Sequence, residues 1–131
     1  MKKLLSILLA TIMVLSFAGC GKDSAVGTVY KKDGGTETLT AKELWEICDT
    51  NLTKYKAQYD NRKVTVIGEV TKIGTSTIRI GENFNCWIIK DLQSYNLSNF
   101  DIGDTVIATG TIDYVFAGEV EVVEGTLKHY N

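Results

Sequence analysis

The spacing of apolar residues along the chain changes near residue 63, from a helical period to an alternating one. Before that point apolar residues recur every three, four or seven positions, and Thr40 followed by Glu43 is the sequence pattern of a helix capping box. We therefore expect one amphipathic helix over about residues 41–59, with its apolar face buried. The positions on that face are Ala41, Leu44, Trp45, Cys48, Leu52, Tyr55 and Tyr59.

After residue 63, apolar residues alternate with polar ones or form short dense runs, which predicts five β-strands. The strands cover about residues 63–70, 77–80, 84–89, 105–115 and 120–127. Gly68 and Gly110 lie inside the first and fourth of them, where a glycine permits a sharp bend. Because closure removes exposed edges, five short, bent, antiparallel strands favour a small barrel over an open sheet. The segment 90–103 is expected to hold at most a turn or two of helix.

The first twenty residues carry the pattern of an export signal. Lys2 and Lys3 precede an almost uncharged apolar run from Leu4 to Phe17. Fourteen helical residues span only about 21 Å, against about 30 Å for the hydrocarbon core of a bilayer, so a permanent transmembrane helix is the weaker interpretation. We expect residues 1–19 to be a signal peptide that is not part of the fold.

The apolar run ends in Phe17-Ala18-Gly19-Cys20, which resembles the bacterial lipobox, in which the cysteine is acylated and the peptide is cut just before it. We therefore expect lipidation at Cys20 and a lipid-anchored protein on the extracytoplasmic side of the cell membrane. The alternative is an ordinary secretory signal that ends near a cysteine. Residues 20–39 lack helical periodicity and are predicted to be the lipidated cysteine and a flexible tether, with one short extended piece around Val29 and Tyr30. The folded domain would then cover residues 40–131.

Composition excludes more than it identifies. The chain has 131 residues, with 14 basic and 16 acidic side chains and a formal charge of −2. Removal of residues 1–19 takes away Lys2 and Lys3 and no acidic residue, which leaves a charge of −4. Because nucleic-acid binding depends on Lys and Arg that neutralise phosphates, this charge argues against a nucleic-acid partner.

The sequence contains no recognisable catalytic or metal-binding motif. It has no Gly-x-Ser-x-Gly and no phosphate-binding glycine loop, and a pair of carboxylates is the one catalytic option left open. His129 is the single histidine, and no Cys and His residues have zinc spacing. We therefore expect no enzyme activity, no metal and no cofactor. Cys48 and Cys86 are expected to be buried and unpaired, with a disulfide as the alternative.

Two segments carry a family resemblance. They are residues 59–70, YDNRKVTVIGEV, and residues 99–106, NFDIGDTV, with Gly110 four residues further on. Together with the preceding helix they resemble the OB-fold, and specifically the bacterial lipoprotein families described as tRNA-anticodon-binding-domain-like. The resemblance covers about residues 40–128. It implies a mainly β fold, a five-stranded OB-fold Greek-key barrel preceded by one amphipathic α-helix, and it supplies no catalytic or binding residue that transfers by position.

A ligand of an OB-fold lies across its second and third strands and the loops beside them. In this chain those strands offer Lys72, Arg79, Asn85 and Trp87 as candidate ligand-binding residues. Trp87 is either an exposed anchor on that face or a side chain covered by the helix or a loop. Two functional hypotheses follow. One is a non-catalytic binding or interaction module for an envelope protein or a small ligand, and the other is a binder of single-stranded nucleic acid or oligosaccharide. The oligomeric state is not predicted.

Overall fold

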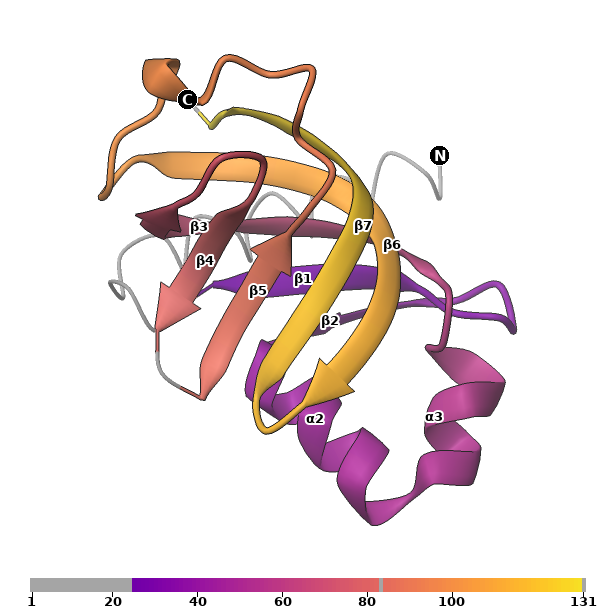
Figure 1. Cartoon of the computed structure of the whole chain (residues 1–131). Helices are drawn as coiled ribbons and strands as arrows, with labels where there is room; N and C mark the ends of the chain where they lie inside the picture. The colour runs from indigo at the N-terminus through magenta and orange to yellow at the C-terminus, as the bar shows by residue number, and fades with distance from the viewer. Residues whose placement is uncertain (1–24, 83, 131) are drawn as a thin grey trace.

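The computed structural model describes residues 25–82 and 84–130, and Figure 1 shows them as one mixed β-sheet with two short helices. The predicted signal peptide, Cys20 and the first residues of the predicted tether lie outside the described residues. Within the described part of the chain, no helix has both the length and the apolar character needed to cross a membrane.

All five strands predicted after residue 63 are confirmed, with ends that differ by at most three residues. The segment 90–103 holds one short 3-10 helix, as expected. The elements in chain order are β1 (Val26–Tyr30), β2 (Thr36–Leu39), α2 (Ala41–Thr50), α3 (Leu52–Gln58), β3 (Lys63–Ile73), β4 (Ile78–Glu82), β5 (Asn85–Ile89), η2 (Leu97–Asn99), β6 (Thr105–Phe116) and β7 (Glu119–His129).

Five of the strands form a ring in the order β3, β4, β5, β7, β6 and back to β3. The strand β3 makes the ring possible because it pairs with β6 over residues 63–69 and with β4 over residues 70–73. The strands β5 and β7 are parallel, and the other neighbours are antiparallel. The alternation of the sequence therefore sorts side chains into those that face the inside of the ring and those that face solvent.

Residues 26–39 form a hairpin. The extended piece expected around Val29 and Tyr30 is part of β1, and the prediction of a flexible tether is wrong over the rest of this stretch. The strand β1 pairs with β2 on one side and with β3 on the other. The hydroxyl of Tyr59 donates to Glu37 Oε1 at 2.5 Å, which ties β2 to the residue that ends α3. Burial and this hydrogen bond raise the pKa of Tyr59, so the hydroxyl keeps its proton. The two strands are short and enclose a polar, glycine-containing turn, which is also the composition of a linker.

The predicted single helix over residues 41–59 is divided at Asn51. The capping box of Thr40 and Glu43 is present as expected. Asn51 has φ −149° and ψ 77°, and its side chain accepts a hydrogen bond from the Lys54 N–H, so it ends α2 and begins α3. An Asn side chain competes with the helical backbone for hydrogen bonds, and this break turns Leu52 toward solvent instead of the core.

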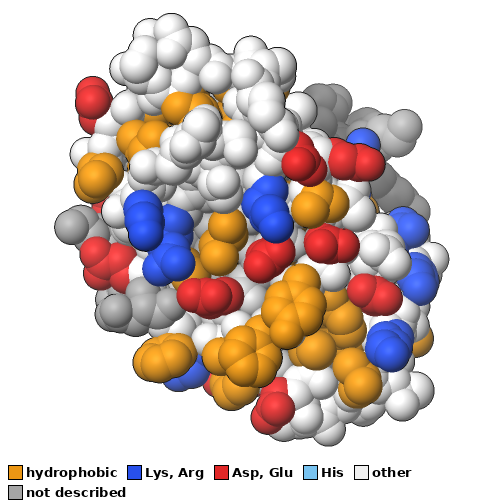
Figure 2. All heavy atoms as spheres, in the orientation of Figure 1, with side chains coloured by type: hydrophobic (Ala, Val, Ile, Leu, Met, Phe, Trp, Pro, Cys, Tyr) orange, Lys and Arg blue, Asp and Glu red, His pale blue; other side chains and the backbone are white. Residues whose placement is uncertain are grey.

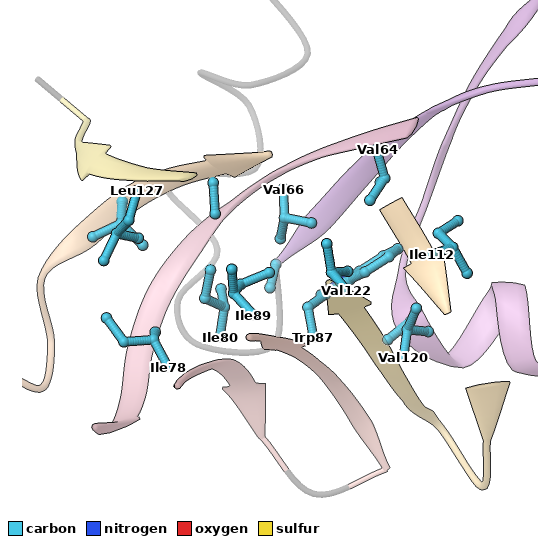
Figure 3. Packing of buried hydrophobic residues seen from close by; sticks show 14 of the residues in the cluster. Val64, Val66, Ile78, Ile80, Trp87, Ile89, Ile112, Val120, Val122 and Leu127 are labelled. Carbon is cyan, nitrogen blue, oxygen red and sulfur yellow. The ribbon is translucent and has the colours of Figure 1, made fainter. Parts of the chain in front are cut away.

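The interior of the ring is filled by apolar side chains around Trp87, which is 0% exposed (Figure 3). Val64, Ile80 and Val122 belong to the same buried cluster. A β-carbon on Gly27 of β1 would lie 2.5 Å from Trp87 Cη2, so the indole occupies the space that a side chain would need there. Trp87 Nε1 has no hydrogen-bond acceptor among the described residues.

We expect valine at Gly110 to destabilise the protein more than valine at Thr65. A β-carbon on Gly110 would lie 2.5 Å from both Val122 Cγ1 and the carbonyl oxygen of Val123, and the strand register shifts at this point. Overpacking of this kind costs about 1–3 kcal/mol, whereas a partly exposed strand position tolerates valine. Gly68 faces Ala25 and Ile80 just as closely and should behave like Gly110. Urea denaturation of residues 21–131 measures this, and equal losses at Gly110, Gly68 and Thr65 would contradict it.

We expect Trp87 to be protected from solvent in the free protein. In a Trp45→Phe variant, the emission of Trp87 should lie at short wavelength and should resist iodide quenching until the protein unfolds, because the indole is enclosed by the ring. Strong quenching of the folded variant would show that the indole reaches the surface.

Candidate functional site

The outer surface of β3, β4 and β5 has a shallow depression of about 240 Å³ next to the turn between β3 and β4. In Figure 2, basic side chains gather over β3 and β4 beside an apolar one. The lining residues are Lys72, Gly74, Thr77, Arg79 and Ile88. The depression therefore combines two cations, one hydroxyl and one aliphatic surface.

Strand register explains why the two cations lie together. Lys72 of β3 and Arg79 of β4 are directly paired, and Arg79 is paired in turn with Ile88 of β5. The neighbours of Arg79, Ile78 and Ile80, are buried inside the ring, so the alternation directs Arg79 outward. The register shifts between Val70 and Lys72, and a bulge of this kind re-aims the side chain that follows it.

Carboxylates on β7 balance part of this positive charge. Arg79 Nη2 lies 3.6 Å from Glu119 Oε2, and Lys90 Nζ lies 3.2 Å from Glu121 Oε1. All four side chains are partly exposed, and an exposed ion pair contributes about 0–1 kcal/mol, so Arg79 can exchange Glu119 for a ligand at little cost. Lys72 is exposed, and none of the described carboxylates forms an ion pair with it.

Of the four candidate residues from the sequence, the structure brings together Lys72 and Arg79 and separates Asn85. Asn85 begins β5, at the end of the strand away from the depression, and its side chain accepts a hydrogen bond from the Lys42 N–H of α2 at 3.4 Å. This hydrogen bond of Asn85 therefore links the sheet to the helix α2. Sequence reasoning did not single out Ile88 or Thr77 as site residues, although Ile88 follows Trp87 and Thr77 lies two residues before Arg79.

Of the two placements considered for Trp87, the exposed ligand anchor is ruled out. The side chain is fully buried and lies in the cluster inside the ring. The residues of β5 could not reveal this, because both alternating sets are largely apolar: Cys86 and Ile88 form one, Trp87 and Ile89 the other. Ile88, and not Trp87, is the residue of β5 that lines the depression on the outer surface.

The described part of the chain contains two cysteines, and neither of them lines the depression. Cys48 and Cys86 are both free thiols, as expected; Cys86 is buried, whereas Cys48 is only partly buried. Burial raises the pKa of each thiol, so both stay protonated at neutral pH. Within residues 25–82 and 84–130, no three His, Cys, Asp or Glu side chains come together in a way that could hold a metal ion. The guanidinium and ammonium groups of Arg79 and Lys72 are well suited to a carboxylate or phosphate group.

Comparison with known proteins gives no match: no family model, no curated protein and no solved structure is significantly similar to the chain. The resemblance drawn from residues 59–70 and 99–106 is therefore supported at a coarser level only, which is a mainly β fold with a ring of five strands.

Proposed function

We propose that this protein is a lipoprotein, anchored through Cys20 on the extracytoplasmic side of the membrane, whose strand ring is an OB-fold barrel that works as a non-catalytic binding module. The order β3, β4, β5, β7, β6, with β5 and β7 parallel, is compatible with a five-stranded Greek-key barrel. The short linker between Cys20 and the first described residue, Ala25, would hold the module close to the membrane.

The observation that carries the binding role is the position of the depression. In an OB-fold the ligand surface consists of the second and third strands with the loops at positions equivalent to 74–77 and 117–118. The depression lies on the strands β4 and β5 beside the first of these loops. Its volume of about 240 Å³ is below the range of typical small-molecule pockets, about 300–1,000 Å³, so it suits one chemical group of a larger ligand.

The ligand group that fits best is a single carboxylate or phosphate, presented by an envelope protein or a small ligand. Lys72 and Arg79 supply the positive charge, and Ile88 supplies apolar contact. Glu119 and Glu121 on the adjacent strand would repel an extended polyanion that continued past the depression. This arrangement disfavours the alternative of a single-stranded nucleic-acid ligand. It also disfavours an uncharged oligosaccharide, because such a ligand would form no ion pair with Lys72 or Arg79.

We expect Cys20→Ala to move the protein out of the membrane fraction. Without a thiol at position 20 no acyl chain can be attached, and two or three acyl chains supply the stable part of the membrane affinity. Membrane fractionation and the mass of the N-terminal peptide measure the change. Cys48→Ala is the matched control and should remain lipidated. A Cys20→Ala protein that is processed and membrane-bound as before would contradict lipidation at this residue.

We expect small anions to bind the depression with a dissociation constant on the order of millimolar, as one or two charge-assisted contacts allow. In residues 21–131, titration with methyl phosphate or acetate should shift the amide NMR signals of Gly74, Thr77 and Arg79. The double change Lys72→Gln and Arg79→Gln should abolish the shifts, and Lys63→Gln, an exposed lysine at the other end of β3, should leave them intact.

Two results would count against this site. Shifts that persist in the double variant would place anion binding elsewhere. Tight binding of oligo(dT) that weakens steeply as salt rises would favour the nucleic-acid alternative, because such binding releases counterions.

A further inference from the structure

Three exposed aromatic side chains form one surface at the end of β4 and β5 that lies away from the depression. Phe84, Tyr114 and Phe116, called here the aromatic cluster, are 72%, 54% and 61% exposed. The rings of Tyr114 and Phe116 are stacked with centroids 6.3 Å apart. Figure 2 shows hydrophobic side chains gathered on the lower part of this face, where the end of β6 and the start of β7 meet the turn before β5.

The backbone brings these residues together from distant parts of the sequence. The turn between β6 and β7 lies against the turn between β4 and β5, and Cys86 N–H donates to the carbonyl of Gly118 at 3.0 Å. Gly118 has φ +79°, and its Cα lies against the backbone of Phe84 with no room for a side chain. The position of the cluster is thus fixed by the fold. Large aromatic groups held together in water usually mark a contact surface.

The described chain begins at the same end of the ring. Ala25 is buried against Gly68, and a β-carbon on Gly81 would lie 3.4 Å from Ala25 Cβ. Gly81 is paired with Cys86 across the turn that carries Phe84. Four residues lie between Cys20 and Ala25, and the five residue steps that join them reach at most about 17–18 Å when fully extended.

We propose that the aromatic cluster docks on the surface of the lipid bilayer that holds the acyl chains of Cys20. This inference rests on the lipidation in the proposed function and goes beyond it, because it gives the module one orientation. Arg79 and Ile88 lie toward the other end of β4 and β5, so docking leaves the depression facing away from the membrane.

The physical driving force is apolar contact strengthened by the tether. Tyr favours the headgroup region of a bilayer, and Phe buries its apolar ring at the boundary between headgroups and acyl chains. A short tether raises the effective concentration of the surface to the millimolar range, so that even weak insertion is populated. Charged residues of both signs border the cluster. Glu119 is paired with Phe116 and Glu121 with Tyr114, and the two carboxylates form ion pairs with Arg79 and Lys90. Docking therefore does not depend on anionic lipid.

The test places a tryptophan reporter in the cluster of the full lipidated protein. In a Trp45→Phe background, Phe116→Trp is compared with Ile102→Trp, which replaces another exposed side chain, 65% exposed, just before the opposite end of β6. Both proteins are purified from membranes and reconstituted in phosphatidylcholine vesicles with bromine atoms near the headgroups. Trp87 stays buried in both and gives the same background.

We expect bromine to quench the reporter at position 116 by about half or more, and to leave the reporter at position 102 nearly unchanged. Adding Phe84→Ser should reduce the quenching at position 116 without unfolding the protein, since Phe84 is exposed. Equal quenching at positions 116 and 102, in protein that floats with the vesicles, would overturn docking and leave the lipid anchor intact.

Two other results would also overturn the proposal, and they differ from each other. Protein that does not float and carries no lipid on its N-terminal peptide would remove the anchor and the docking together. A blue-shifted reporter at position 116 in detergent, with a dimer in sedimentation, would show that a second copy of the chain covers the cluster instead of lipid.

Discussion

The indole of Trp87 occupies the interior of the strand ring, and the arrangement of the N-terminal hairpin depends on it. Burying a tryptophan removes about 150–250 Å² from water, which is worth several kcal/mol. The unpartnered Nε1 costs about 1–3 kcal/mol of that gain, so the balance still favours burial. Because the six-membered ring of Trp87 lies where a side chain of β1 would be, only glycine fits at position 27. The hairpin is held onto the ring by this contact and by the pairing of β1 with β3.

The sequence was sufficient for the strands β3 to β7, because each has a clear alternation or a dense apolar run between turn residues. The sequence was insufficient where one local pattern is compatible with two different structures. The stretch 26–39 has the composition of a linker and the structure of a hairpin, since β1 and β2 are stabilised by long-range pairing that no local pattern records. Asn51 stands inside an otherwise regular helical period, and its side chain caps a second helix instead.

Part of the candidate site could be predicted from the order of the strands, and part of it depended on packing that the sequence does not show. The prediction of a site on the second and third predicted strands needed only the order of the strands, and register then brought Lys72 and Arg79 together. The choice between the two faces of β5 needed the packing of the whole ring, because Cys86 and Trp87 are both apolar and both fully buried. The outer face that results has Lys72 and Arg79 toward one end of β4 and β5 and the aromatic groups at the other. Glu119 joins the two ends, because it is paired with Phe116 and its carboxylate lies 3.6 Å from Arg79 Nη2.

The double pairing of β3 has a consequence for how the chain folds. Residues 63–69 meet partners between residues 105 and 111, so the ring cannot close until β6 has joined it. Contacts between such distant segments slow folding, typically to milliseconds or seconds for a domain of this kind. Until β6 and β7 arrive, edges of β3 and β5 remain open to pairing with other chains. A chain cut short before residue 105 would thus be an aggregation-prone sheet with open edges, and about the last fifth of the sequence decides whether the ring closes.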